Sequence, residues 1–305
     1  MSRLDPLRER QDVLEAIEAQ RDRQLDDETG QPSRVPDRSS AEPSRAPSPS
    51  VETPGPNVLL NQSRGLLYDR NRGYRLRESE IRTLAELGKF RVVGPAELSM
   101  HAYGGQIDEM QDDLRNLLRR GLIGKGVFEG PEHTPRELLT LTKRGHRLLR
   151  ASRVLPRDQA TYYGFVKPRE ANHDADLYKL YQKEIARIVK AGGRNPRVVL
   201  DFELKRKINR DLAKLGCAAR PEIARSHGLR VVGGRIPVPD VRIEYEKSSG
   251  ETARVDLELV TEHYRGRSVR DKVQAGFSLY HLRGEGDRLR RVLDGQELTA
   301  EIFSL

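Results

Sequence analysis

The sequence contains very little cysteine and few aromatic residues. Of its 305 residues, one is cysteine (Cys217), none is tryptophan, and Phe, Tyr and Trp together make up 5%. A single cysteine excludes an internal disulfide and a cysteine-rich zinc site. No apolar run approaches the roughly 18 residues of a membrane-spanning helix, and the first residues lack the apolar core of a secretory signal. We therefore expect a cytoplasmic protein with no membrane partner.

The charge is unevenly distributed along the chain, whose formal net charge is +9. Residues 1–60 contain 8 Lys and Arg against 12 Asp and Glu, whereas residues 61–160 contain 19 against 13 and residues 161–305 contain 28 against 21. Two basic segments suit a polyanionic partner such as double-stranded DNA. The alternative is a charged surface that serves only solubility.

Residues 1–60 are predicted to form a disordered tail with a short possible helix. Leu4, Leu7, Leu14 and Ile17 give the first 28 residues a weak helical pattern, which fits either a partner-docking element or a tail without a role. Residues 30–56 hold 7 of the 17 prolines among Ser, Arg and Glu. Such a segment cannot bury enough apolar surface to offset its chain entropy.

Residues 61–155 are predicted to form a winged helix-turn-helix domain. Ser79 is expected to cap a first helix, a second is expected to end at Gly104 and Gly105, and a third helix is expected to end at Gly121. Two strands around a Gly- and Pro-rich tip follow at 122–142. The ending "LTKRGHRLL", which comes after "LLRRGLI", resembles the segment that follows the wing in bacterial winged-helix domains.

In a winged helix the third helix enters the major groove and the wing contacts phosphates. The third helix here has an apolar side that starts at Ile107. Its outer face is expected to expose Gln106, Asp108, Glu109, Gln111, Asp112, Asp113, Arg115 and Asn116, whose four acids oppose deep insertion. Contacts to the DNA backbone are expected from Arg115, Arg119, Arg120, Lys125, Arg136, Lys143 and Arg144. A winged helix that docks a protein without touching DNA is the alternative.

Residues 156–305 are predicted to form an α/β domain with a mixed sheet, so the fold class is α+β with two domains. The expected elements are a linker at 153–172, a helix at 174–193, a strand at 197–204, a basic helix at 205–216, strands at 241–246 and 252–260, a helix at 268–282 and a small hairpin in the last 20 residues.

The two strands around the turn "KSSG" carry the chemistry. Asp256, Glu258 and Val260 share one strand face because side chains repeat every second residue, and Asp240 leads the neighbouring strand. Converging carboxylates at Asp240, Asp256 and Glu258 would hold Mg²⁺, which prefers oxygen ligands. Such an ion activates water for attack on a phosphodiester. Acids that merely face water are the alternative.

Pro239-Asp240 followed by Asp256-Leu257-Glu258 resembles the PD-(D/E)XK motif of the restriction-endonuclease-like fold. This resemblance, which covers about residues 172–282, implies that Asp240 and Glu258 are catalytic if the domain cuts DNA. Val260 stands in the place of the motif lysine. Lys272, on the following helix, is the candidate for a migrated lysine if it points at Glu258. Gln274 stands nearby in the sequence, and Glu184 is a possible extra ligand.

From about residue 75 onward the chain also resembles a bacterial replication-relaxation and plasmid-mobilisation accessory family. The features that carry this resemblance are "LTKRGHRLL", "PVPDVRIEY", "DLELVTE", and the spaced Lys272 and Tyr280. The resemblance implies a DNA-binding accessory protein that works beside a relaxase, with a nuclease-like domain used for binding. An active Mg²⁺-dependent endonuclease and a protein-interaction adaptor without DNA contact remain as alternatives.

Other candidate chemistry finds little support in the sequence. His173, His263 and His281 are too scattered to predict a metal set or a general base. Tyr264 and Tyr280 are isolated, which argues against a tyrosine nicking site of the relaxase type. The glycine-rich "GKGVFEG" contains no phosphate-loop Lys-Thr or Lys-Ser pair, which argues against nucleotide hydrolysis.

Overall fold

The computed structural model describes residues 64–70, 72–130, 133–261, 266–282, 286, 289–291 and 302–305. By contacts the chain divides into two units, Met1–Val51 and Glu52–Leu305, and every described residue belongs to the second. The predicted tail at 1–60 lies outside the described residues, as do Tyr264, His263 and most of the hairpin predicted in the last 20 residues. Within the described part of the chain, no helix is both long and apolar enough to cross a membrane.

Over the described residues the architecture combines helices with three separate sheets, in agreement with the predicted α+β class. The elements follow in the order β1 (Arg64–Asp69), β2 (Arg72–Arg77), α2 (Glu78–Lys89), α3 (Pro95–Ala102), α4 (Ile107–Arg119), β3 (Ile123–Glu129), β4 (Pro135–Leu141), α5 (Lys143–Ser152), α6 (Pro168–Lys190), β5 (Arg194–Leu200), α7 (Asp201–Leu215), a 3₁₀ turn (Cys217–Ala219), α8 (Arg220–Ser226), β6 (Val241–Glu246), β7 (Thr252–Val260), α9 (Gly266–Ala275), β8 (Ser278–His281) and β9 (Ile302–Ser304).

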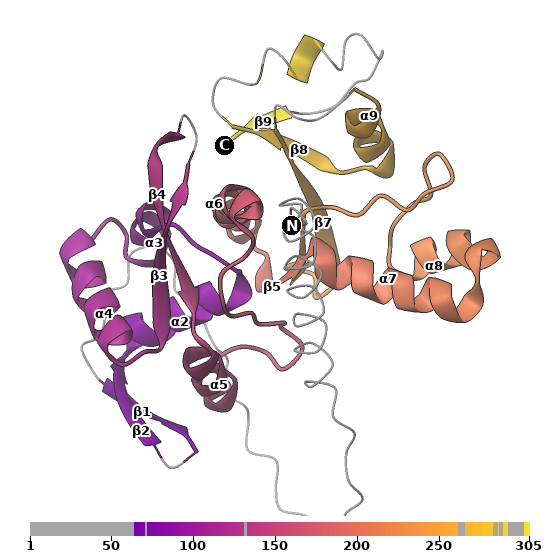
Figure 1. Ribbon diagram of the computed structural model, residues 1–305. Helices are drawn as coiled ribbons and strands as arrows, with labels where there is room; N and C mark the ends of the chain where they lie inside the picture. The colour runs from indigo at the N-terminus through magenta and orange to yellow at the C-terminus, as the bar shows by residue number, and fades with distance from the viewer. Residues whose placement is uncertain are drawn as a thin grey trace, which may run out of the picture. The chain divides into compact units, whose positions relative to one another are not determined.

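The first part of this unit has three helices followed by an antiparallel hairpin, β3–β4, and a further helix, α5 (Figure 1). The sequence predicted this order, but the antiparallel hairpin β1–β2 that precedes α2 was not predicted. Strand β2 buries Tyr74 and Leu76 by strict alternation. The sequence signal for this strand was the alternation of Tyr74 and Leu76 with the polar Arg75 and Arg77, since a period of two is the pattern of a sheet with one face covered.

Helix α2 begins at Glu78, two residues earlier than a cap at Ser79 would allow. Arg77 is the N-cap residue, and its backbone N–H donates to Glu80 Oε2 at 2.6 Å. Ser79 lies inside the helix and is buried. The predicted cap was therefore wrong, because the Glu80 carboxylate accepts the hydrogen bond of the Arg77 N–H and so satisfies an N-terminal donor without a Ser side chain at the N-cap.

Helix α5 starts with a conventional cap and a very close backbone approach. Thr142 Oγ1 accepts a hydrogen bond from Gly145 N at 3.1 Å, as expected of a threonine N-cap. A Cβ atom added at Gly145 would lie 1.9 Å from the backbone oxygen of Leu122. Position 145 therefore requires glycine, because only a residue without a Cβ fits between α5 and the start of β3.

The second part is built on a five-stranded mixed sheet with the order β5-β6-β7-β8-β9. Strands β5, β6 and β7 are antiparallel neighbours, whereas β7, β8 and β9 are parallel. Helix α9 makes the crossover from β7 to β8, which parallel strands require. The predicted mixed sheet is thus present, and Glu258 pairs in register with Leu279 of β8.

The two faces of this sheet carry different side chains. Val241 and Leu257, which pair across β6 and β7, pack into the main hydrophobic core with Tyr178 and Leu180 of α6. Arg242, which points to the other face, donates to the backbone oxygen of His227, just after α8. The strand alternation therefore turns the apolar residues toward α6 and the charged residues toward α7 and α8.

Two predicted elements had the wrong extent. Residues 201–204 were predicted to continue a strand, but helix α7 starts at Asp201, directly after β5. The helix predicted at 268–282 ends at Ala275, and after Gly276 (φ 87°) the chain enters strand β8. In both cases sheet pairing decides the boundary, since Leu200 and Leu279 each pair with a neighbouring strand.

The segment between α5 and α6 is firmly attached to both parts. Tyr162 N donates to Gly88 O at 2.8 Å, and Gln159 exchanges two hydrogen bonds with the backbone of Val198. One continuous core includes Leu84 of α2, Leu139 of β4 and Leu257 of β7. The expected linker at 153–172 is therefore shorter than predicted, because α6 already begins at Pro168, and the boundary near residue 155 does not separate two cores.

Candidate functional site

The structure brings together three of the residues that the sequence singled out: Asp240, Glu258 and Lys272. Lys272 Nζ lies 2.6 Å from Glu258 Oε1 and donates to Val238 O at 2.7 Å. The backbone N–H of Asp240 points to Glu258 Oε2 at 3.3 Å. Helix α9 thus packs over the hairpin so that Lys272 reaches Glu258, which is the condition that a migrated lysine must meet.

Strand pairing and burial explain why Glu258 is held so firmly. Its side chain is completely buried in the central strand β7, and the Lys272 side chain is 17% exposed. A buried carboxylate requires a charged partner, because the low-dielectric interior does not solvate it. Lys272 supplies this partner from helix α9, whereas the motif would place its lysine at position 260 on β7.

Asp240 sits at the end of the loop that leads into β6, with both carboxylate oxygens engaged. Its Oδ2 accepts a hydrogen bond from Leu259 N at 2.9 Å, and its Oδ1 lies 3.6 Å from His173 Nε2. Burial lowers the pKa of the His173 imidazole, whereas the hydrogen bond and the charge of Asp240 raise it. The second effect is larger, so the pKa of His173 lies above its ordinary value.

His173 therefore lies at this site, although it was not predicted there from the sequence. It lies in the first turns of α6, far from Asp240 in the sequence. The only signal for it was the amphipathic pattern of α6, whose start was predicted several residues too late. Had the helix been extended back to Pro168, His173 would have been placed on the element that packs against the hairpin.

Asp256 is held in a separate ion pair. Arg242, directly opposite on β6, donates to both carboxylate oxygens of Asp256 at 2.6 and 2.9 Å. Arg242 is almost fully buried and Asp256 nearly so. This two-point contact is the strongest geometry for an arginine–carboxylate pair, and it occupies the carboxylate that was predicted to be a third metal ligand.

Glu184, the possible extra ligand, belongs to another cluster, formed between α6 and β8. Its Oε2 accepts hydrogen bonds from Tyr280 Oη at 2.5 Å and from Arg187 Nη1 at 2.9 Å. Burial and the bond to Glu184 raise the pKa of the Tyr280 hydroxyl well above its ordinary value. A hydroxyl with a raised pKa is a weak nucleophile, so this cluster has the character of a structural contact.

The donor set for Mg²⁺ reduces to Asp240 and Glu258. Among the described residues there is no group of three or more His, Cys, Asp or Glu side chains placed to hold a metal ion. Two carboxylates fit Mg²⁺ only where substrate phosphates and water complete its six positions. An ion would also have to share Glu258 with Lys272.

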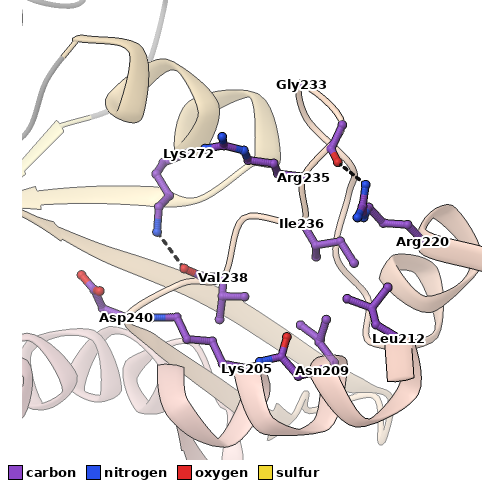
Figure 2. A pocket seen from close by; sticks show the side chains of 12 residues that line it. Lys205, Asn209, Leu212, Arg220, Gly233, Arg235, Ile236, Val238, Asp240 and Lys272 are labelled. Carbon is purple, nitrogen blue, oxygen red and sulfur yellow. Dashed lines mark hydrogen bonds between the residues drawn. The ribbon is translucent and has the colours of Figure 1, made fainter. Parts of the chain in front are cut away.

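A cleft with a volume of about 620 Å³ opens beside this site (Figure 2). Its lining comes from α7, from the start of α8, from the loop before β6 and from α9, and it includes both Asp240 and Lys272. Three further cations line it: Lys205, Arg220 and Arg235. The cleft therefore leads from a cationic surface to the Asp240–Glu258–Lys272 contact.

A second cationic surface lies in the first part of the unit, where α4 ends and α5 begins. Arg119, Lys143 and Arg144 are exposed, and Arg120 is partly exposed. The Arg144 guanidinium donates to the backbone oxygen of Arg120 at 3.3 Å, which holds the two helix ends together. We refer to Arg119, Arg120, Lys143 and Arg144 as the basic patch.

The other predicted DNA contacts are engaged within the protein. Arg136, at the start of β4, binds Asp176 of α6 at 2.9 Å and lies 3.5 Å from Glu97. Lys125 pairs with Glu137 across the hairpin at 2.5 Å, and Arg115 pairs with Asp112 on α4. Arg136 is mostly buried, whereas Lys125 and Arg115 remain exposed and can exchange these partners for a phosphate.

Helix α4 differs from the predicted outer face at two positions. Asp113 is fully buried, where it binds Arg77 at 3.0 Å and accepts a hydrogen bond from Tyr103 Oη at 3.1 Å. Ile107 is 55% exposed, although the pattern placed it on the buried side. The error has a physical cause, because a charged residue is predicted to face water unless its buried partner, here Arg77, is recognised. The exposed acids Asp108 and Asp112 and the partly exposed Glu109 remain at the start of this helix.

No protein-family model, curated protein or solved structure matches this chain.

Proposed function

We propose that this protein binds double-stranded DNA, with a winged helix-turn-helix as its first part and a restriction-endonuclease-like domain as its second. The observation that carries the proposal is the basic patch. Four cations gather where the third helix ends and the helix after the hairpin begins, and none of them forms an ion pair with a carboxylate in the described part of the chain. Cations held on helix ends are suited to contact phosphates.

The order of the elements supports the first half of this proposal. Three helices precede a two-stranded hairpin, and α4 corresponds to the helix that a winged helix inserts in the major groove. The acids at the start of α4 oppose deep insertion, so the proposal is backbone contact rather than base reading. The resemblance to the plasmid-mobilisation accessory family suggests DNA of a plasmid or mobile element, and a relaxase as a protein partner.

A gel-shift series at increasing salt tests the proposal. Because phosphate contacts release counterions, the slope of log K against log salt is about −0.9 for each contact. Arg119→Ala and Arg144→Ala should each reduce that slope by about 1. Lys190→Ala, which removes an exposed cation from the end of α6, serves as the control and should leave the slope unchanged.

The opposite result would favour a protein-interaction adaptor. If the full-length protein fails to shift a duplex at about 50 mM salt, where phosphate contacts are strong, DNA binding is overturned. The same gel run with a candidate relaxase then asks whether DNA is retained only through that partner.

Metal-dependent DNA cleavage is a second candidate, and the contact between Lys272 and Glu258 favours it. Asp240 and Glu258 would hold Mg²⁺, which when bound polarises a phosphodiester oxygen and lowers the pKa of a water. Lys272 would provide the positive charge that the motif lysine usually provides. Plasmid nicking with Mg²⁺ or Mn²⁺ should then be lost in Asp240→Asn and Glu258→Gln and kept in Lys190→Ala. Equal inactivity of all four proteins would leave DNA binding as the function.

A further inference from the structure

We infer that the cleft beside Asp240 and Lys272 binds an unpaired nucleotide, such as a frayed strand end, with its phosphate on the cationic rim and its base on an apolar floor. The inference rests on the proposed DNA binding and adds a substrate class and a second site. It concerns residues that the basic patch does not include.

The rim of the cleft has the charge that a phosphate requires. Lys205, Arg220, Arg235 and Lys272 line it, and Asp240 is the single carboxylate of the lining (Figure 2). Lys205 pairs with Asp201 at 2.6 Å and Lys272 with Glu258, so two of the four charges are already balanced. The cations left over are those of Arg220 and Arg235.

These two arginines are placed differently. Arg220 donates to Gly234 O at 2.8 Å, which anchors the loop tip to α8. Arg235 is exposed, and its guanidinium forms no hydrogen bond or ion pair with any residue that the structure describes. An arginine without an internal partner can present its planar donor fork to a phosphate.

The floor of the cleft is apolar, which phosphate binding alone does not require. Leu212, Ile236 and Val238 are partly buried and pack on a small hydrophobic core that includes Ile208. Their outer atoms face the cleft in Figure 2. A planar base laid on this floor would remove apolar surface from water, which is favourable.

One polar side chain stands on the floor side, on α7. Asn209 is exposed and lines the cleft, and its side-chain amide makes no hydrogen bond within the described part of the chain. An amide carries both donors and an acceptor, which are the groups that bind the edge of a base. The volume of about 620 Å³ lies within the roughly 300–1,000 Å³ of sites that take small ligands.

The loop that forms one wall leaves the backbone accessible. Gly233 and Gly234 have positive φ angles of 55° and 74°, and a Cβ atom added at either would meet nothing within 4 Å. A paired duplex end cannot place a single base on the floor of such a cleft without unpairing. The geometry therefore selects a strand end or an extruded nucleotide over an intact duplex.

The experiment titrates dAMP and inorganic phosphate into full-length protein and follows both by calorimetry. We expect dAMP to bind at least tenfold more tightly than phosphate, because only dAMP uses the floor. Arg235→Ala and Asn209→Ala should each weaken dAMP binding at least fivefold, and both positions are exposed, so the fold should persist. Arg230→Ala removes an exposed cation from the same loop outside the lining and should change nothing.

Two outcomes would overturn the inference. Equal affinity for dAMP and phosphate would mean that the cleft binds only phosphate. An equal loss of dAMP affinity in Arg230→Ala would mean that binding depends on the overall positive charge of the loop and not on the cleft. A parallel gel shift separates this from the proposed function: a blunt duplex and a duplex with a three-nucleotide overhang are compared. If both bind equally, DNA binding stands and the nucleotide site falls. If neither duplex binds while dAMP does, the nucleotide site stands and the proposed binding of double-stranded DNA falls.

Discussion

Replacement of Lys272 by methionine tests how strongly the buried contact with Glu258 stabilises the fold. The Nζ–Oε1 distance is 2.6 Å and Glu258 is fully buried. At an effective dielectric constant of about 20, the attraction of two unit charges at this distance is about 6 kcal/mol. Part of this attraction offsets the desolvation of the lysine, so removal of one partner should cost about 3–5 kcal/mol.

The double variant Lys272→Met/Glu258→Gln separates the pair from the two single changes. Glu258→Gln leaves an ammonium that still reaches water at the cleft, so it should cost only about 1–2 kcal/mol. The double variant removes both charges of the pair and should be more stable than Lys272→Met alone. A coupling energy of about 1–3 kcal/mol is expected between residues in direct contact.

Urea unfolding followed by circular dichroism measures all three variants beside Lys205→Met. That control breaks an exposed pair with Asp201, which should matter by less than about 1 kcal/mol. In thermal scans the loss of stability in Lys272→Met corresponds to a fall in Tm of about 6–20 °C, at about 2–4 °C per kcal/mol. If Lys272→Met is no less stable than the control, Glu258 is not held as a buried charge and the description of the site is wrong.

Three further predictions test other contacts. Arg136→Ala should lower the free energy of unfolding by about 3 kcal/mol, because it leaves Asp176 buried without its partner, but it should not change the DNA affinity of the folded protein. Arg144→Ala should instead weaken DNA binding and leave the stability unchanged. Urea unfolding and gel shifts on both variants measure this, and the opposite pattern would show that Arg136, not Arg144, contacts DNA. Burial raises the pKa of Asp174 to about 6 against the opposing charge of Arg91, so the folded state binds more protons than the unfolded chain between about pH 4 and pH 6. Wild type should therefore lose stability relative to Asp174→Asn as pH rises through that window, with a constant difference above it; a difference that does not change with pH would contradict this. Gly145→Ala should cost about 3 kcal/mol through the clash with a backbone oxygen, while Gly124→Ala, whose nearest new contact is 3.6 Å, should stay within about 1 kcal/mol of wild type; similar losses in both variants would refute the clash.

Local patterns predicted most helices and strands because each carries its own periodicity. The alternation in 241–246 and 252–260 gave both strands of the hairpin, and the spacing from Met110 to Leu117 gave α4. Boundaries failed where pairing with a distant strand decides the conformation. Nothing local to residues 278–281 distinguishes a helix from a strand, and these residues form a strand because they pair with β7 and β9.

The candidate site could be predicted only where one short segment determines it. Lys272 was a candidate only on the condition that it points at Glu258, which the short spacing between β7 and α9 permits and which the structure shows to be met. The state of Asp256 did not follow, because a charged strand residue is assigned to solvent unless its cross-strand partner is known. Arg242 is that partner, and the register that sets it opposite Asp256 emerges only when β6 and β7 pair.

Each acid at the site already has a partner within the protein, and this determines whether the site binds an anion or a cation first. Glu258 is neutralised by Lys272, Asp256 by Arg242, and Asp240 lies beside His173. A cation that entered would compete with an ammonium already 2.6 Å from its best ligand. An incoming phosphate meets no such competition, because Arg235 has no partner among the described residues. The balance of charges therefore favours an anion over a cation as the first ligand of this surface, and under the proposed DNA binding any metal would enter the site after the nucleic acid.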